Sequence, residues 1–155
     1  MNPERITDLL ELISSVELFR DMNREELEVL ADLMEFQQID ATKEIFREGD
    51  PGGKMLVITS GTVEVQKRRS HGSGRVVIAR FERGGVIGEM SLIDGMPRSA
   101  TVVALQPTKY YYLSKEAMKS LIENHKDISI KLLQELAILL SLRLRNTSGW
   151  FADVF

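Results

Sequence analysis

The sequence predicts an α+β protein in which an antiparallel β-unit lies between helical segments. Helical periodicity occupies the first third of the chain and returns near residue 114. Between them, residues 36–113 contain short runs rich in β-branched and aromatic residues, interrupted by glycine, which is typical of an antiparallel barrel, roll or sandwich. The length of 155 residues fits one domain with its own core. We therefore expect a single domain (1–155) with a helical lead-in (1–35), a β-unit (about 36–113) and C-terminal helices (about 114–148).

Composition excludes several classes of protein. The chain has no cysteine, which excludes disulfides, thiolate metal sites and cysteine nucleophiles and is compatible with the cytoplasm. Its first residues lack the basic region and the continuous apolar run of a signal peptide. No uncharged apolar stretch approaches the length of about 18 residues that a transmembrane helix requires. We expect a cytoplasmic protein without a membrane span.

Charge is unevenly distributed along the chain. Residues 1–50 hold 5 basic and 14 acidic side chains, a balance of −9, and residues 51–155 hold 15 basic and 9 acidic ones, a balance of +6. A general nucleic-acid binder usually has a broader basic excess than this. A mildly positive half that carries the glycine-rich segments suits a small anion, although ordinary surface variation explains the charges equally well.

Two amphipathic helices are expected before the β-unit. Asn23, followed three residues later by Glu26, forms a capping-box pattern at the start of the second helix. Apolar residues recur at helical spacing in both helices. They are Ile6, Leu9, Leu10 and Ile13 in the first helix, and Leu27, Leu30, Leu33 and Met34 in the second.

Six runs in the middle of the chain are expected to be strands. Glycine-containing turns separate them, at residues 49–53, 60–61, 71–74 and 84–85, because glycine tolerates the backbone angles that tight turns require. The runs are EIFREGD, KMLVITSG, TVEVQKRR, GRVVIARFERGG, ATVVAL and KYYYLS.

Two helices are expected after the β-unit. Ser114 is a suitable N-cap for the first, and the second runs from about Lys126 to Asn146. Its middle, LAILLSL, is apolar nearly all round, so the helix must be covered on more than one side. We expect the β-unit as one cover and the same helix of a second copy as the other, in a homodimer; burial within its own chain is the alternative. One apolar stripe of this helix consists of Leu133, Leu136, Ala137, Leu140 and Leu144, and the apolar residues outside it are Ile138, Leu139 and Leu142.

One segment, GEMSLIDGMPRSAT at residues 88–101, has the residue types of an anion site. A short helix after its first glycine would present free amides to an anion, and Ser91 is small enough to let the anion approach. Arg98 can pair with two phosphate oxygens, and Ser99 adds a hydroxyl donor. Glu89 would repel a phosphate but can accept a hydrogen bond from a ribose hydroxyl. The segment therefore suits a ribose phosphate; on composition alone, a polar turn with a surface ion pair is the alternative.

The same segment resembles a family motif. The order G-E-x-S-L, a short gap, then P-R-S-A-T resembles the phosphate-binding cassette of the cyclic nucleotide-binding domain family, which includes the catabolite activator protein and the regulatory subunits of cAMP-dependent protein kinase. The stretch IFREGDPGGKMLVITSGTVEV resembles the family's approach to its β-roll. The resemblance covers residues 15–148. It implies a stand-alone domain with an antiparallel, jelly-roll-like β-roll flanked by N-terminal helices and two C-terminal helices.

The resemblance also implies roles for individual residues. Glu89 would accept from the ribose 2′-hydroxyl, and Arg98 and Ser99 would bind the cyclic phosphate together with amides of the short helix. Val65 and Ile78 would line an apolar wall under the base and sugar, a position that ordinary core residues also occupy. The full predicted set is Gly88, Glu89, Met90, Ser91, Arg98, Ser99, Val65, Ile78, Thr147 and Ser148.

The end of the long helix, LSLRLRNTS, resembles a second feature of the family. In bacterial members a polar pair at this place reaches the exocyclic amine of adenine, and Thr147 and Ser148 occupy it here. A polar helix terminus that stops at Gly149 is the alternative. The aromatic residues that follow are expected to pack on the domain or on a partner rather than to cover the base. They are Trp150, Phe151 and Phe155.

The function that the resemblance implies is sensing without catalysis. We expect the ligand to be cAMP, with cGMP as the second candidate, because cGMP binders of the family often have threonine where Ser99 follows Arg98. We expect no cofactor, no metal and no catalytic residue. The bound nucleotide would reposition the long helix toward an unidentified protein effector. Direct DNA binding is not expected, because the sequence ends at GWFADVF without a helix-turn-helix.

Two other functions stay open on the sequence alone. One is a degenerate domain that keeps the fold, binds no nucleotide and acts as a protein-interaction module. The other is a metal-dependent cupin-type enzyme on a similar β-architecture. The sequence disfavours the enzyme, because its two histidines, His71 and His125, lack the spacing of metal ligands.

Overall fold

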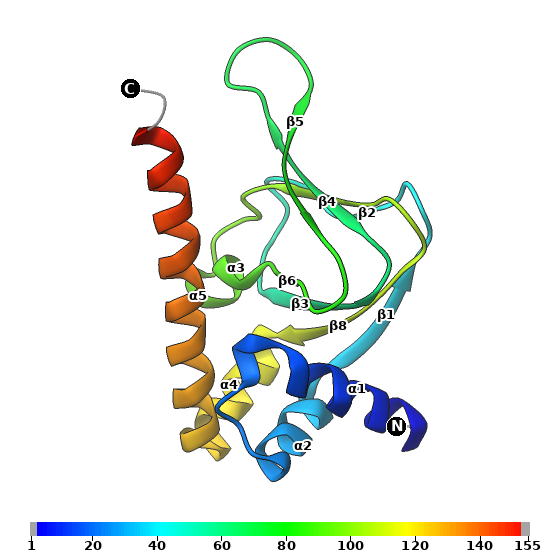
Figure 1. Ribbon diagram of the computed structural model, residues 1–155, viewed down its shortest axis with the longest axis vertical. Helices are drawn as coiled ribbons and strands as arrows, with labels where there is room; N and C mark the ends of the chain where they lie inside the picture. The colour runs from blue at the N-terminus through cyan, green and yellow to red at the C-terminus, as the bar shows by residue number, and fades with distance from the viewer. Residues whose placement is uncertain (1–2, 153–155) are drawn as a thin grey trace.

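The computed structural model describes residues 3–152, and the chain has an α+β fold. Two antiparallel sheets form a β-roll, helices cover one end of it, and one long helix runs along its side (Figure 1). The described residues form eight strands, in the sheet orders β1-β8-β3-β6 and β2-β7-β4-β5. Their bounds are β1 Glu35–Ile39, β2 Glu44–Phe46, β3 Lys54–Ser60, β4 Val63–Arg68, β5 Arg75–Phe81, β6 Val86–Ile87, β7 Thr101–Ala104 and β8 Thr108–Ser114.

The antiparallel β-roll confirms the predicted fold class. Each of the six predicted runs contains a strand, and β4 and β5 form a hairpin that projects from the body of the roll (Figure 1). Two strands, β1 and β6, were not among the predicted runs. The first is mostly polar because both of its faces are partly exposed, and the second has two residues, too few for any periodicity.

The N-terminal helices form as predicted. α1 (Pro3–Ser15) is followed by the 3-10 turn η1 (Glu17–Phe19) and by α2 (Arg24–Leu33). The Asn23 side chain accepts from the Glu26 amide at 3.0 Å, and the Glu26 carboxylate accepts from the Asn23 amide at 2.8 Å. This reciprocal pair confirms the capping box and begins α2 at the residue that follows Asn23.

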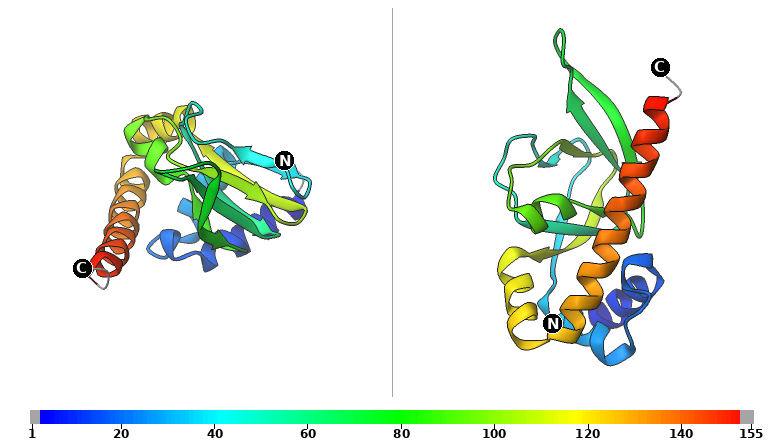
Figure 2. Two further views of the ribbon diagram at one scale, coloured as in Figure 1. Left: turned by 90° about the horizontal axis from the view of Figure 1, so that it is seen from above. Right: turned by 90° about the vertical axis from the view of Figure 1, so that its left-hand side faces the viewer.

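The C-terminal helices are α4 (Lys115–Asn124) and α5 (Lys126–Ala152). Ser114 caps α4 as predicted, because its side chain accepts from the Ala117 amide at 3.1 Å. α5 does not end at Gly149 but continues to Ala152, and it stands beside the roll over most of its length (Figure 2).

Of the apolar stripe noted in the sequence of α5, only Leu136 is buried within the chain. The buried apolar residues of the helix are Ile128, Leu132 and Leu136, whereas Leu133 and Leu144 are exposed. The middle of the helix is apolar nearly all round, so its periodicity does not select a single face. The face that is buried is the one in contact with neighbouring elements, among them η1 and α4.

Two apolar clusters stabilise the fold. One lies between the helices and the sheet that contains β3 and β8, and includes Phe19, Leu30, Leu113 and Leu132. The other fills the interior of the roll. α5 is thus anchored at its N-terminal half, and its C-terminal half runs past the open side of the roll. None of the described helices combines the length and apolarity needed to cross a bilayer.

Candidate functional site

A cavity of about 780 Å³ lies between the roll, the short helix α3 (Glu89–Asp94) and the C-terminal half of α5. It brings together nine of the ten predicted site residues. They are Val65, Ile78, Gly88, Glu89, Met90, Ser91, Arg98, Ser99 and Thr147. The side chains of the tenth, Ser148, and of Trp150, Phe151 and Phe155 lie outside the described part of the chain.

Gly88 places α3 beside the roll. Its φ of +81° is left-handed, a conformation that glycine adopts without a steric penalty. A Cβ at this position would lie 2.6 Å from Nη1 of Arg98 and 2.7 Å from the carbonyl oxygen of Lys54. The glycine therefore both turns the chain into α3, which confirms the predicted short helix, and leaves room for the arginine.

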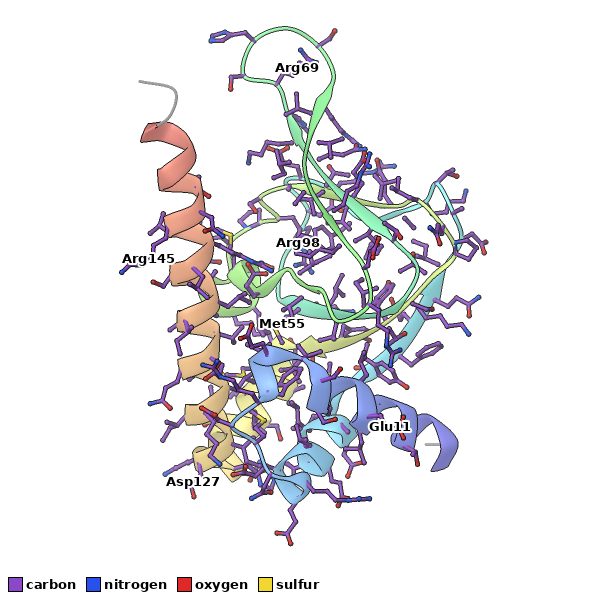
Figure 3. All side chains as sticks on the ribbon, in the orientation of Figure 1. Glu11, Met55, Arg69, Arg98, Asp127 and Arg145 are labelled. Atoms are coloured by element: carbon purple, nitrogen blue, oxygen red, sulfur yellow. The ribbon has the colours of Figure 1, made fainter. Side chains whose placement is uncertain are left out.

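Arg98 is held inside the cavity wall (Figure 3). It is only 6% exposed, and its Nη1 donates to the Lys54 carbonyl at 2.8 Å and to Oγ of Ser91 at 2.7 Å. The guanidinium carbon lies 4.0 Å from the ring centroid of Phe46, a cation–π distance. Nε is buried without a hydrogen-bond partner among the described residues. The side chain is therefore fixed in place, and its Nε–H group can still donate a hydrogen bond.

The charge of Arg98 is also unmatched. Burial lowers the pKa of Arg98 from its ordinary value, whereas the negative charges of Asp50 and Glu89 act in the opposite direction. The guanidinium stays protonated at neutral pH because arginine starts from so high a pKa. Within the described residues Arg98 forms no ion pair. A buried cation without a carboxylate partner favours an anionic ligand, because burying an unpaired charge is costly.

Ser91 connects three parts of the site. Its Oγ accepts from Arg98 and, at 3.3 Å, from the amide of Gly53, and it donates to the carbonyl of Gly88 at 3.2 Å. The sequence predicted only that this residue must be small. In the structure its hydroxyl joins the turn before β3 to α3 and to the arginine.

Glu89 has a partner that the sequence analysis missed. The carboxylate is 3% exposed, and its Oε1 accepts from Nη1 of Arg143 at 2.6 Å. Arg143 also donates from Nη2 to the carbonyl of Val86 at 2.7 Å, and its guanidinium carbon lies 5.3 Å from the ring centroid of Phe81. Arg143 thus ties α5 to the roll and to α3. Its spacing of four residues before Thr147, which places both on one helix face, was the available signal.

The remaining predicted residues that line the cavity differ widely in exposure. Val65 is buried at 8% exposure, as an apolar wall requires, but Ile78 is 56% exposed and is therefore not an ordinary core residue. Met90 on α3 is 48% exposed, and Ser99 is exposed. The Thr147 hydroxyl donates to the carbonyl of Arg143 at 2.9 Å, so its hydrogen is engaged within α5.

We also searched the described residues for acidic and histidine side chains that could bind a metal ion. In the part of the chain that the structure describes, no group of three or more histidine, aspartate or glutamate residues is placed to hold a metal ion. The charged groups of the cavity are instead two arginines and the carboxylates near them, an arrangement suited to binding a ligand that carries both an anion and hydroxyl groups.

Comparison with known proteins identifies a matching family. The sequence model described as "Cyclic nucleotide-binding domain" matches residues 36–125. This segment contains Glu89 and Arg98 and ends before α5, so the match does not include Arg143 or Thr147.

Solved structures agree with this match. A cyclic nucleotide-binding domain from Methylobacillus flagellatus KT is similar with a TM-score of 0.86 and 34% identity, over 98% of this chain and 85% of that chain. The catabolite activator protein of Thermus thermophilus is similar with a TM-score of 0.80 and 28% identity, over 89% of this chain and 62% of that one.

A curated relative is much longer. The cAMP-dependent protein kinase regulatory subunit of Eremothecium gossypii is 29% identical over 112 residues, which is 72% of this chain. The chain spans 23% of the length of that protein.

Proposed function

The chain belongs to the cyclic nucleotide-binding domain family, and on that premise we propose that it is a regulatory sensor that binds a cyclic nucleotide between the roll and α5. The observation that carries the proposal is Arg98, a buried guanidinium without an ion-pair partner among the described residues, in the same cavity as the buried carboxylate of Glu89. An anion and a hydroxyl-bearing sugar are the two chemical groups that this pair suits.

The two ends of the ligand would bind different residues. Arg98 would pair with the cyclic phosphate, and the Ser99 hydroxyl would add a donor at the rim. Glu89 uses Oε1 for Arg143, and its Oε2 has no hydrogen-bond partner among the described residues, so it is available to a ribose 2′-hydroxyl. The apolar wall that includes Val65 and Ile78 would contact the base and sugar. The ligand that we propose first is cAMP, ahead of cGMP.

The signal would leave the site through α5. Arg143 contacts Glu89 directly, so a ligand at Glu89 and the position of α5 are physically coupled. A ligand shifts such an equilibrium only by the difference in its affinity for the two helix positions. The output would be a surface presented to a protein effector.

A homodimer through α5 is part of the same proposal. α5 carries exposed apolar residues over several turns. They are Ile130, Leu133, Ile138, Leu142 and Leu144. A second copy of the helix would remove part of this apolar surface from water.

One observation favours a second function, a ligand-free interaction module. Glu89 already has a cationic partner in Arg143, so α5 is held against the cassette without any nucleotide. If this ion pair is permanent, the domain would present α5 in one fixed position.

The experiment that separates these two functions is a thermal-unfolding titration with cAMP, cGMP and AMP. At 100 times its dissociation constant a ligand adds about 2.7 kcal/mol to the free energy of unfolding. We expect such a shift for wild type with cAMP and none for Arg98→Ala, because the phosphate loses its cationic partner. Arg98→Lys keeps the charge and should retain a small part of the shift, since it cannot pair with two phosphate oxygens.

Arg69→Ala is the matched control, because Arg69 lies at the tip of the projecting β4–β5 hairpin (Figure 3). It should respond to cAMP as wild type does. No shift of the wild type with any cyclic nucleotide at millimolar concentration would overturn the sensor and leave the interaction module.

A further inference from the structure

We propose that the projecting β4–β5 hairpin is a docking surface for an acidic, extended segment of a protein partner, which would pair with the outer edge of β5. The hairpin consists of β4, the turn at residues 69–74 and β5. The proposed function leaves the chemistry of the protein effector open. The docking surface does not depend on a bound nucleotide, because it consists of the edge of a strand and the cations of the hairpin.

The outer edge of β5 faces no other described strand. β5 is the last strand in the sheet order β2-β7-β4-β5, and among the described residues it pairs only with β4. The amide and carbonyl groups along its other edge therefore bond to no strand of the described chain. Such an edge is a template for a further extended chain, which adds main-chain hydrogen bonds. Because the hairpin projects beyond the roll, a second chain can reach it (Figures 1 and 2).

Apolar side chains on the same strand are exposed. Val76, Val77 and Ile78 are 38%, 50% and 56% exposed. A strand added along β5 would place its Cβ atoms about 5 Å from theirs and would remove part of their apolar surface from water. β1, at the edge of the other sheet, is mostly polar, so it offers an added strand fewer apolar contacts.

The hairpin carries a large excess of positive charge. Residues 65–81 contain five basic and no acidic side chains. Three of the basic residues have carboxylate partners, which are Lys67 with Glu48 at 3.4 Å, Arg75 with Glu44 at 2.7 Å and Arg80 with Glu64 at 3.0 Å. Arg68 and Arg69 are exposed, and their guanidinium groups form no ion pair with any described residue. Positive charge that is not balanced within the domain favours an acidic partner.

Two of the arginines face each other across the hairpin. Arg68 is the register partner of Arg75. Like charges at directly opposite positions of neighbouring strands destabilise the pair. Glu44 compensates the charge of Arg75, but no described carboxylate forms an ion pair with Arg68. Acidic side chains of a strand added along β5 would supply negative charge at this end of the hairpin.

An acidic protein segment fits these observations better than three other occupants do. A second copy of the hairpin would bring further cations to a surface that already has unpaired ones. A membrane favours apolar residues at the tip, but the tip, SHGSG at residues 70–74, has no large apolar side chain. A nucleic acid strand favours aromatic side chains on which its bases stack, and residues 67–80 contain no phenylalanine, tyrosine or tryptophan.

The test is a fluorescence-anisotropy titration of the whole chain with a labelled peptide of alternating glutamate and valine. Two further peptides serve as controls: one is N-methylated at every residue, and the other has lysine in place of glutamate. We expect the first peptide to bind and N-methylation to weaken binding at least about tenfold, because the peptide loses the donors of several backbone hydrogen bonds. The lysine peptide should not bind, because the hairpin is cationic.

The matched variants are Arg68→Ala/Arg69→Ala on the hairpin and Arg24→Ala/Lys126→Ala at the first residues of α2 and α5, away from the hairpin (Figure 1). We expect the hairpin variant to bind the glutamate–valine peptide about three- to tenfold more weakly, since exposed ion pairs contribute little singly. High salt should reduce this difference. The second variant removes the same charge and should bind as wild type does. Circular dichroism should show the same secondary structure in wild type and both variants.

Amide chemical shifts should place the peptide on residues 75–81. Absence of binding of the glutamate–valine peptide at millimolar concentration overturns the inference, and so does equal weakening in the two double variants. Equal affinity for the N-methylated peptide shows attraction by charge without strand pairing, which overturns it too. Binding of the chain to phosphatidylglycerol vesicles, without binding of the peptide, assigns the hairpin to a membrane surface and overturns the proposed protein partner.

Discussion

In this site, small residues are as important for the geometry as the charged residues. Gly88 has no side chain, and that absence allows Nη1 of Arg98 to come within 2.6 Å of the point that a Cβ would occupy. Ser91 is small, and it fixes the same guanidinium through its hydroxyl. The geometry of the proposed phosphate site therefore depends on close backbone packing, not only on the charged group.

Gly88→Ala tests this dependence. We expect it to lower the free energy of unfolding by about 2–3 kcal/mol and to abolish the cAMP-induced thermal shift, because the new methyl group adds a clash with Arg98 to the cost of a left-handed alanine. Gly72→Ala is the matched control, since Gly72 has a φ of +87° and a Cβ added there would meet nothing within 4 Å. It should cost about 1–2 kcal/mol and keep the shift. Equal loss of binding in both variants would show that backbone strain alone is responsible.

At the scale of elements, Glu26 connects two helices. It completes the capping box of α2, and both of its oxygens accept from Nζ of Lys131 on α5 at 2.8 Å. The hydrogen bond from Lys131 is the largest cause of the lowered pKa of Glu26, followed by the bond from the Asn23 amide. The anchored half of α5 is therefore stabilised by an ion pair as well as by apolar packing.

The sign of the resulting pH dependence is fixed by this lowered pKa. A carboxyl group with a lower pKa in the folded state stabilises the fold above its unfolded value of about 4.5, and the contribution is lost as the pH falls through the folded value. We expect Glu26→Gln to unfold more easily than wild type at pH 7, by at most about 1 kcal/mol because the pair is partly exposed. Denaturant unfolding should show the difference shrinking as the pH falls below about 4.5. Glu25→Gln, at an exposed neighbour, is the control, and a Glu26→Gln difference that does not shrink on acidification would contradict the assignment.

For the whole molecule, the decisive feature is that α5 belongs to two environments. Its first half packs in the core through Leu132 and Leu136, and its second half contributes Arg143, Asn146 and Thr147 to the cavity. The helix also carries exposed apolar residues along its length. One rigid element therefore joins the core, the proposed ligand and the proposed dimer surface.

Ile138→Glu tests the proposed dimer. Ile138 is 43% exposed in the middle of α5, and a charge buried there between two helices would lack a partner. We expect sedimentation velocity to show that the substitution raises the dimer dissociation constant at least tenfold. This corresponds to a loss of about 1.4 kcal/mol in the free energy of association. Ile122→Glu on α4 is the matched control, since Ile122 is also 43% exposed, and it should leave the association unchanged. A monomeric wild type, or equal effects of both variants, would exclude α5 as the dimer surface.

The sequence by itself determined the features that depend on neighbours along the chain. The caps at Asn23 and Ser114 and the turn into α3 involve residues within about one helical turn, so local chemistry specifies them. The GEMSL and PRSAT segments lie close together in sequence, and the cavity that they line agrees with their predicted grouping. Whether they bind a nucleotide stays a prediction.

Only the tertiary structure decided the contacts between distant segments. Arg143 lies 54 residues from Glu89, and Arg98 lies 44 residues from the Lys54 carbonyl that orients it. No periodicity selects such pairs, because the middle of α5 is apolar nearly all round and can turn more than one face to the core. The packing of η1 and α4 chose Leu132 and Leu136 as the buried face of α5, and that choice turned Arg143 and Asn146 toward the cavity.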